Sequence, residues 1–498
     1  MTKEDKLFPK QDKLKSKTLN GLLWAFFDAV GLQGIQFVIL LVLARILQPA
    51  EFGIIAMLTV FISVAYSLID SGYASALIQK KNSTFEDENS VFYFTIFMGV
   101  ITTSLLWFSA PWIASFYNEP SLTLLARVLS ITLFIDSLGT IHYTLMKKAV
   151  DFKKLTKISV IASIFSGTIG IVMAFNDFGV WSLVGYTVSN KLFRLVLYWV
   201  FNRWRPRLIF SISSLRSMFG YGSNILFIGL LDTFFNHLYA LVIGKFFSAA
   251  DLGYYARAKS LQQIPVQNIS GIVSRVTFPI FSKIQDDKIR LKRGLKKTIA
   301  SVALITFPMM IGLYVVSKPL IIFLLTSKWS PSVPYLQLLC GIGLTAPLNR
   351  INLNILKAIG LSDLLFRLEL FKKALIVIAI LITYQRGIKI MIIGQVVVYL
   401  LSYFLNLYYI SKLIGYHKFE QIKDIFPSFI LASIMGFGIY LFTFIQIDNQ
   451  FLLLIIQSIS GTVFYALLCY VFKVPSFFEL FSIIKLKLQK INALKSKK

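Results

Sequence analysis

Ionisable side chains lie inside several of the long apolar runs of this chain. A charged group at the centre of a bilayer is costly, so it usually faces an internal cavity or pairs with another charge. The basic residues in these runs are Arg127, Lys191, Arg194, His237, Arg275 and Arg350. The acids are Asp28, Asp70, Asp136 and Asp232. We predict that these residues line a cavity between membrane helices.

The spacing of these residues indicates which of them act together. Lys191 and Arg194 are three residues apart and therefore share one face of a helix. Two cations on one face favour an anionic ligand such as a phosphate. The acids are expected either to couple transport to a cation or to pair with arginines. For Arg194, Arg275 and Arg350 the alternative is that the side chain extends toward the lipid headgroups.

The residue types of common enzyme and metal sites do not come together in the sequence. Cys340 and Cys469 both lie in apolar runs, far from metal-ligand spacing. The three histidines, His142, His237 and His417, are too scattered to suggest a metal centre. No nucleophile triad or phosphate-binding loop is evident. We therefore predict no catalytic residue, no metal and no cofactor.

Composition predicts an all-α polytopic membrane protein. Of 498 residues, 56% are hydrophobic and only 15% are charged, against roughly 25% charged in soluble domains. Apolar runs of about 20 residues match the bilayer when they form helices. The net charge of +28 comes from basic segments between these runs. That pattern is typical of cytoplasmic loops rather than of nucleic-acid binding.

We predict about fourteen transmembrane helices from runs of this length. Both ends of the chain are expected in the cytoplasm, because the loops on the other side hold only a few cations. Those cations are Lys318, Lys328, Arg386 and Lys389. The expected helices are 20–47, 53–79, 90–117, 122–146, 156–175, 178–201, 217–246, 253–281, 296–316, 333–357, 361–384, 388–411, 425–446 and 451–472.

An internal repeat relates two segments that are 200 residues apart. A basic residue, an acid, an apolar residue and a glycine fall in register at the outer turn after the first helix of each half. The turn residues are Arg45, Glu51 and Gly53 in the first copy and Lys245, Asp251 and Gly253 in the second. We expect the basic and acidic residues of each copy to pair and the glycines to allow a tight turn.

The repeat predicts two six-helix lobes followed by two added helices. Because six is even, the lobes have the same orientation, and a pseudo-two-fold axis along the membrane normal should relate them. The expected segments are a basic cytoplasmic tail 1–19, an N-lobe 20–201, a cytoplasmic linker 202–216, a C-lobe 217–411, the helix pair 425–472, and a basic amphipathic tail 473–498. The last segment is expected to lie on anionic lipid.

Three stretches give the chain a family resemblance. Ala44–Gly53, Asp70–Ile78 and Leu145–Phe152 resemble polysaccharide-export proteins of the Wzx type, particularly the WzxC-like branch. The similarity extends from about residue 15 to residue 480. That family belongs to the multidrug/oligosaccharidyl-lipid/polysaccharide exporter superfamily, which also contains the multidrug antiporters (MATE) and the peptidoglycan-precursor flippases (MurJ).

The resemblance implies a flippase of the bacterial cytoplasmic membrane. Its cargo would be a polyprenyl-diphosphate-linked oligosaccharide for surface polysaccharides such as lipopolysaccharide or exopolysaccharide. Movement would follow alternating access around a central, usually cationic cavity, driven by Na⁺, H⁺ or the membrane potential. The resemblance implies a monomer that works beside polysaccharide polymerase machinery. The several acids in the apolar runs depart from a purely cationic cavity.

Three alternatives remain open at this stage. Two belong to the same superfamily: a flippase of a peptidoglycan lipid precursor, and a drug/cation antiporter. The third is a membrane-bound glycan-modifying enzyme, which the short outer loops disfavour because they leave no room for an extracytoplasmic catalytic domain.

Overall fold

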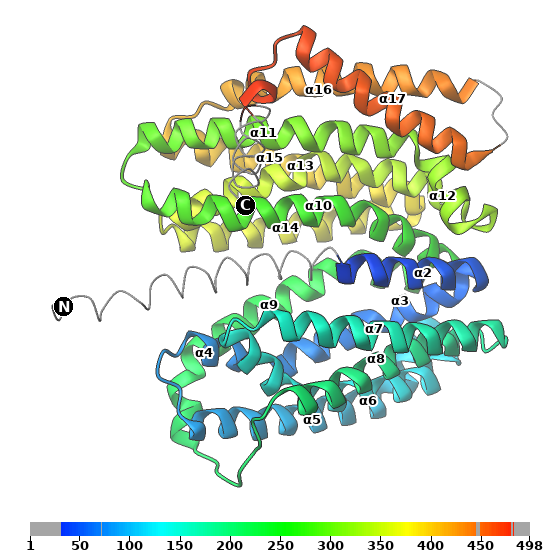
Figure 1. Ribbon diagram of the computed structural model, residues 1–498, viewed down its shortest axis with the longest axis vertical. Coiled ribbons are helices and arrows are strands. Elements are labelled where there is room, and N and C mark those ends of the chain that lie inside the picture. The colour runs from blue at the N-terminus through cyan, green and yellow to red at the C-terminus, as the bar shows by residue number, and fades with distance from the viewer. Residues whose placement is uncertain (1–30, 71, 445–448, 480–481, 483–498) are drawn as a thin grey trace, which may run out of the picture. The chain divides into compact units, whose positions relative to one another are not determined.

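The computed structural model describes residues 31–70, 72–444, 449–479 and 482, and every regular element within them is a helix (Figure 1). Helices satisfy their own backbone hydrogen bonds, which is what apolar segments in lipid require. Asp28, the tail 1–19 and most of the tail 473–498 lie outside the described residues. The all-α fold predicted from composition is confirmed.

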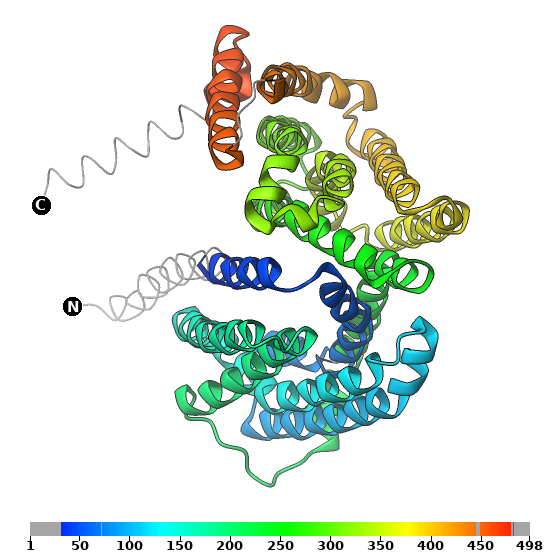
Figure 2. The same ribbon diagram turned by 90° about the vertical axis from the view of Figure 1, so that its right-hand side faces the viewer.

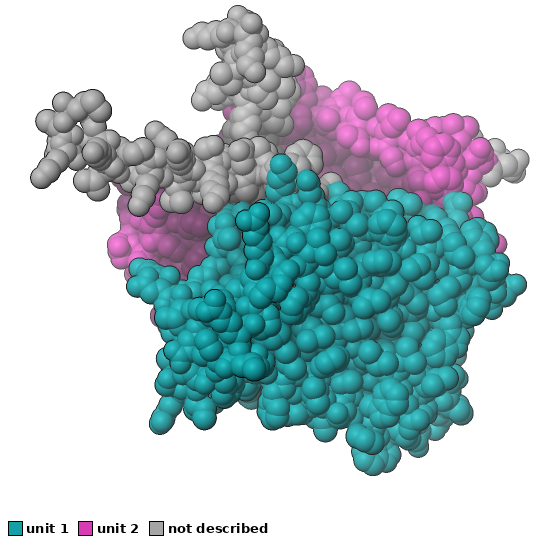
Figure 3. Space-filling model, turned by 60° about the horizontal axis from the view of Figure 1, so that its bottom comes forward, with its two compact units in different colours: residues 1–253 teal, residues 254–498 magenta. Residues whose placement is uncertain are grey.

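The chain divides into two compact units, residues 1–253 and 254–498, which Figure 3 shows in different colours. In unit 1, α5 packs along α6 and α7 along α8, as Figure 2 also shows. The helices of unit 1 are α2 (Gln33–Ile46), α3 (Pro49–Asp70), α4 (Tyr73–Gln79), α5 (Phe85–Tyr117), α6 (Leu122–Lys148), α7 (Phe152–Phe175), α8 (Val180–Phe201) and α9 (Ile212–Phe246).

Helix α10 (Ala249–Lys283) begins in unit 1 and continues into unit 2. In unit 2, α13 packs on both α11 and α15, and α16 packs on α11. The other helices of unit 2 are α11 (Lys288–Val315), α12 (Ser317–Leu325), η2 (Ser327–Trp329), α13 (Ser332–Ala358), α14 (Ser362–Thr383), η3 (Tyr384–Arg386), α15 (Ile388–Ile414), α16 (Lys418–Tyr440), η4 (Leu441–Phe444) and α17 (Gln450–Val471).

Each of the fourteen expected ranges overlaps a helix, and most boundaries agree within a few residues. The second range, 53–79, differs because it contains two helices, α3 and α4. Gly72 lies between them with a φ of 71° and is the N-cap of α4. Within the described residues, nine helices are long and apolar enough to cross a membrane. The exact number of fourteen spans therefore stays a prediction, while the multi-pass character is clear.

Helix α9 packs against α3, α4 and α5 inside unit 1. Ser67 on α3 and Thr233 on α9 also share a hydrogen bond of 3.1 Å between their hydroxyl oxygens. The sequence repeat assigns this helix to the start of the second lobe, at residue 217. The boundary between the two compact units lies later in the chain, at Gly253. The lobe boundaries taken from the repeat therefore remain a prediction.

The two copies of the repeated outer turn touch each other. A Cβ added to Gly53 would lie 1.7 Å from the carbonyl oxygen of Ala249, and one added to Gly253 would lie 2.0 Å from that of Pro49. Pro49 and Ala249 are themselves equivalent in the repeat, so the contact is reciprocal, as across a local two-fold axis. Both glycines are helical, and they are needed for close backbone approach rather than for a turn with positive φ.

Candidate functional site: a charged cavity in unit 1

A cavity of about 270 Å³ lies within unit 1 between α3, α4, α6 and α8. It gathers four of the charged residues that the sequence singles out, namely Asp70, Asp136, Lys191 and Arg194. Its other lining residues include Tyr66, Ala74, Ser75, Ile78, Gly139, Thr140, Tyr143, Thr144, Lys147 and Tyr198. Residues from α3, α6 and α8 that are far apart in the sequence therefore meet at one site.

An ion pair between Asp136 and Lys191 joins α6 to α8 across this cavity. Lys191 Nζ lies 2.6 Å from Asp136 Oδ2, and the two side chains are 30% and 18% exposed. The Lys191 ammonium also lies 5.3 Å from the ring centroid of Tyr66 on α3, a cation–π distance. Partial burial strengthens this attraction relative to a pair in water, and it makes either charge costly without its partner.

A polar stripe on α6 extends the site toward the end of the helix. Asp136, Thr140, Tyr143 and Lys147 occupy positions i, i+4, i+7 and i+11, which lie on one helical face. Lys147 Nζ lies 5.7 Å from the centroid of the Tyr143 ring. Lys147 follows the expected helix 122–146 directly and was not among the predicted cavity residues. The spacing of this stripe is the signal that could have revealed it.

Arg194 follows Lys191 by one turn of α8 and lines the same cavity, in keeping with their predicted shared face. Its Nε is buried and has no hydrogen-bond partner. Formally, the cavity holds three cations, Lys147, Lys191 and Arg194, against the two acids Asp70 and Asp136. The site can therefore accept one further negative group while its own acids remain charged.

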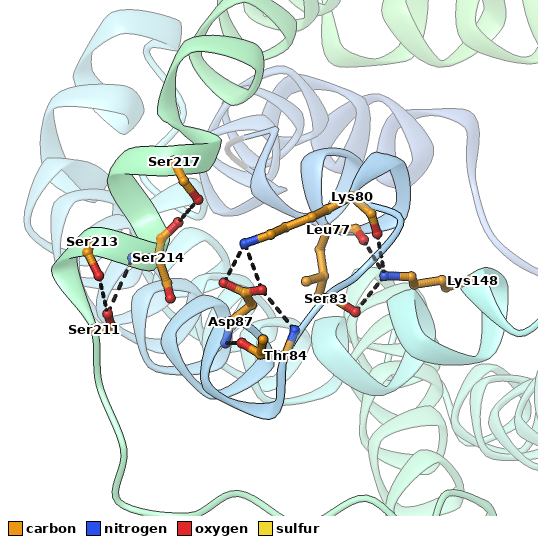
Figure 4. Close-up of polar contacts among 10 residues, drawn as sticks. All are labelled: Leu77, Lys80, Ser83, Thr84, Asp87, Lys148, Ser211, Ser213, Ser214 and Ser217. Atoms are coloured by element: carbon orange, nitrogen blue, oxygen red, sulfur yellow. Dashed lines mark hydrogen bonds and ion pairs between the residues drawn. The ribbon is translucent and has the colours of Figure 1, made fainter.

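The short helix α4 forms one wall of the cavity, and Figure 4 shows how its end is held. Lys148 Nζ donates to the carbonyl oxygens of Leu77 and Lys80, at 2.9 and 2.8 Å, and to Ser83 Oγ at 2.6 Å. These carbonyls at and beyond the end of α4 lack intrahelical partners, so the ammonium acts as a C-terminal cap.

A second contact ties the segment after α4 to the start of α5 (Figure 4). Lys80 Nζ lies 2.8 Å from the carboxylate of Asp87, which is almost fully buried. The same carboxylate accepts from Thr84 N at 2.9 Å, and Thr84 Oγ1 accepts from Asp87 N, which completes a capping box. These contacts fix the cavity wall to the body of unit 1.

Arg127 lies outside the cavity although it is on α6. It precedes Asp136 by nine residues, which turns it to the opposite face of the helix. Its guanidinium lies 5.7 Å from the centroid of the Trp107 ring on α5. Its Nε is buried and has no hydrogen-bond partner. A role for Arg127 in ligand binding stays a prediction, and the structure does not bring it to the other cations.

The remaining charged candidates are not among the residues that line this cavity. Asp232 and His237 lie on α9, where Asp232 is exposed and His237 is half-buried. Arg275 on α10 and Arg350 on α13 are both exposed on unit 2. Their roles stay predictions.

The outer turns are held by the acids that the repeat identified. Glu51 Oε2 accepts from Gln48 N at 2.6 Å, and Asp251 Oδ2 accepts from the hydroxyl of Ser248 at 2.7 Å. Each acid is the third residue of its helix and bonds back to the residue just before that helix, which stabilises the N-terminal turn. Lys245 differs from the expectation, since its Nζ donates to the carbonyl of Phe116 at the end of α5 rather than pairing with Asp251.

Unit 2 has a cross-helix polar pair of its own, but it is uncharged. Asn406 Nδ2 on α15 donates to Asn349 Oδ1 on α13 at 2.8 Å, and both side chains are buried. In the predicted repeat these are the fourth and sixth helices of the second half, as α6 and α8 are of the first. The chain therefore keeps a charged connection between this helix pair in the first half and a neutral one in the second.

Unit 2 also contains a cavity of about 760 Å³ between α11, α13, α15 and α16. Most of its lining is apolar or aromatic, including Met310, Tyr314, Leu344, Phe429 and Phe437. Its chemistry suits a hydrocarbon chain.

Comparison with known proteins gives a consistent result. A family model described as "Polysaccharide biosynthesis protein" matches residues 42–334. The lipopolysaccharide biosynthesis protein WzxC of Escherichia coli (strain K12) is 28% identical over 427 residues, which cover 84% of this chain and 86% of that protein. The teichuronic acid biosynthesis protein TuaB of Bacillus subtilis (strain 168) is 27% identical over 441 residues, covering 86% and 90%.

Among solved structures, the fold resembles that of the lipid II flippase MurJ in its inward closed conformation. The TM-score is 0.73 at 16% identity, and the alignment covers 91% of this chain and 98% of that one. At this level of identity the likeness concerns the fold alone.

Proposed function

We propose, because the chain belongs to the polysaccharide biosynthesis protein family, that it is a flippase for polyprenyl-diphosphate-linked oligosaccharides. It moves repeat units of a surface polysaccharide from the inner to the outer leaflet of the bacterial cytoplasmic membrane. The protein is a transporter rather than an enzyme. Relatives named for lipopolysaccharide and teichuronic acid biosynthesis support this assignment, and so does a fold that resembles a lipid flippase.

The observation that carries the proposal is the charged cavity of unit 1. A diphosphate is a compact anion, and Lys147, Lys191 and Arg194 line one small space. Asp136 Oδ2 pairs with Lys191 Nζ at 2.6 Å. An arriving phosphate oxygen can take the place of this carboxylate, so that Lys191 exchanges one anion for another without being left unpaired.

The acids give the site a means of coupling. When the diphosphate binds to Lys191, Asp136 loses its ion-pair partner and gains affinity for a cation. We propose that Na⁺ or H⁺ then binds at Asp136 or Asp70 and that its release resets the ion pair. The reciprocal dependence of ion and lipid binding is the thermodynamic requirement for such coupling.

The apolar cavity of unit 2 supports a cargo with a long hydrocarbon tail. We propose that the polyprenyl chain uses this surface or the surrounding lipid while the head group moves by alternating access between lobes 20–201 and 217–411. Both termini lie in the cytoplasm in this proposal, and the protein acts as a monomer beside the polymerase that consumes its cargo.

Loss of the gene tests this function directly. A deletion strain should accumulate lipid-linked repeat units on the inner leaflet and lose the surface glycan. Wild-type protein should restore export, and Arg194→Ala should not. Arg127→Ala is the matched control, because this arginine faces away from the cavity. Normal surface glycan in the deletion strain, with no redundant exporter, would contradict the proposal.

The alternatives give different outcomes in the same strains. Accumulation of a peptidoglycan precursor would indicate a lipid-precursor flippase. Increased drug sensitivity with normal glycan would indicate a drug/cation antiporter. A glycan of altered structure that still reaches the surface would indicate a glycan-modifying enzyme.

A further inference from the structure

Residues 202–211 connect α8 to α9 and form a non-helical segment, which we call the strap. It lies at the same end of unit 1 as Lys148 and Asp87. The strap is fixed to α5 through its backbone. Arg207 N donates to Asn89 Oδ1 at 2.6 Å, and Ser211 N donates to Ser90 Oγ at 2.9 Å. A segment expected to be a simple linker is therefore bound to the body of the unit.

Aromatic packing and a helix cap hold the first half of the strap. The Trp204 ring lies 5.4 Å from the ring centroids of both Phe92 and His142. Arg205 donates to the carbonyl oxygen of Trp199 at 2.9 Å and to that of Asn202 at 2.6 Å, which caps the end of α8. The strap therefore presents its remaining side chains in a fixed arrangement.

Those remaining side chains are apolar and exposed. Leu208 is 96% exposed, Phe210 54% and Ile212, at the start of α9, 73%. Packing within unit 1 does not explain large apolar groups at a loop tip, since they bury little surface there. Contiguous exposed apolar groups at such a place indicate a binding surface.

The charge of the same segment identifies what it binds. Residues 202–217 contain Arg203, Arg205, Arg207 and Arg216 and no acid. Arg203 and Arg207 are exposed. The segment also joins the predicted span α8 to α9, which is long and apolar enough to cross a membrane, and we therefore expect it near the headgroups. Cations beside apolar groups at this depth match anionic lipid, whose phosphates and acyl chains take both kinds of side chain.

We propose that the strap is an anchor for the anionic membrane surface. Leu208, Phe210 and Ile212 enter the boundary between headgroups and acyl chains, and Arg203 and Arg207 bind lipid phosphates. Because the strap is tied to α5 and α8, this anchor fixes the depth of unit 1 in the leaflet. The inference does not depend on the identity of the cargo.

Depth measurements by spin labelling test the anchor. The full-length protein, with both native cysteines replaced (Cys340→Ala, Cys469→Ala), carries one label at Leu208→Cys in vesicles that contain phosphatidylglycerol. The readout compares collisions with oxygen, which enriches in lipid, and with a water-soluble nickel chelate. Glu86→Cys is the aqueous control at the same end of the unit, and Phe108→Cys, a site 72% exposed on α5, is the control for the bilayer interior.

We expect the oxygen-to-nickel ratio at position 208 to fall between those of the two controls. It should shift toward the aqueous control in pure phosphatidylcholine, and also when Arg203→Ala and Arg207→Ala are added. A ratio equal to that of Glu86→Cys in phosphatidylglycerol vesicles would overturn the proposal. Protection found only in native membranes would overturn it in favour of a protein partner, and label–label broadening in favour of a second copy. Insertion that is equal in both lipids would also overturn it.

Discussion

Replacing Gly53 with alanine should destabilise the outer end of the protein. The added Cβ would lie 1.7 Å from the carbonyl oxygen of Ala249, whereas ordinary contacts begin near 3.4 Å. The obstacle is backbone, which cannot rotate away as a side chain can, so the starts of α3 and α10 must move apart by well over an ångström. Overpacking of this kind costs about 1–3 kcal/mol.

Gly53 lies within a helix, and replacing a helical glycine with alanine also has a stabilising effect. A control variant is needed to separate this gain from the clash. Alanine is favoured over glycine within a helix by about 1 kcal/mol. Gly229 on α9 has nothing within 4 Å of an added Cβ, so Gly229→Ala should show this gain alone. The difference in unfolding free energy between the two variants should therefore be about 1–3 kcal/mol, with Gly53→Ala the less stable.

The reciprocal contact at Gly253 leads to a second expectation. Gly253→Ala should resemble Gly53→Ala, because its Cβ would meet Pro49 in the equivalent way. The double variant should lose less than the sum of the two, since one separation of the helices relieves both clashes. Thermal unfolding of purified variants in one detergent, followed by tryptophan fluorescence, gives the ranking. Equal stability of Gly53→Ala and Gly229→Ala would contradict the expected clash. Simple addition of the losses of Gly53→Ala and Gly253→Ala would contradict the shared contact.

Further substitutions test the cavity and the helix cap at its wall. Asp136→Asn and Lys191→Met should each lower stability by about 1–3 kcal/mol, since each leaves a partly buried group without its partner. The double variant should be less affected than the two losses predict together, because no unpaired charge remains; a double-mutant cycle of unfolding measures this, and additive losses would contradict a direct pair. Arg194→Ala should reduce lipid flipping by about tenfold or more with folded protein retained, since one charge-assisted contact of about 1.5–3 kcal/mol is lost, whereas Arg127→Ala should have little effect; wild-type activity of Arg194→Ala in a vesicle flipping assay would mean that Arg194 does not contact the cargo. Lys148→Met removes three donated hydrogen bonds from the end of α4 and should lower the unfolding midpoint and increase proteolysis there; unchanged protease sensitivity would argue against this cap.

Much of the fold could be predicted from the sequence because hydrophobic length is a local property. The apolar runs placed most of the described helices within a few residues, and the run 53–79 divides in the structure at Gly72. The repeat was equally visible at Gly53 and Gly253. The close contact that each glycine allows could not be predicted, because the atoms that each one meets lie about 200 residues away along the chain.

The cavity could be predicted only in part, for a similar reason. Spacing on one helix correctly grouped Lys191 with Arg194, but it could not show that Asp136 lies 2.6 Å from Lys191, because that contact joins two helices. Arg127 was included by residue type, although helical geometry alone already turns it away from Asp136. Lys147 was excluded as a loop residue because the end of α6 lies two residues later than expected.

Transport of the lipid itself tests the proposed flippase function most directly. The purified protein in vesicles is supplied with a polyprenyl-diphosphate-linked oligosaccharide on one side, and the fraction that reaches the other leaflet is followed with a membrane-impermeant glycan-cleaving enzyme. We predict transfer well above that of protein-free vesicles, reduced about tenfold or more in Arg194→Ala and retained in Arg127→Ala. Transfer no faster than in protein-free vesicles, with the protein folded and an ion gradient of either Na⁺ or H⁺ imposed, would contradict the account.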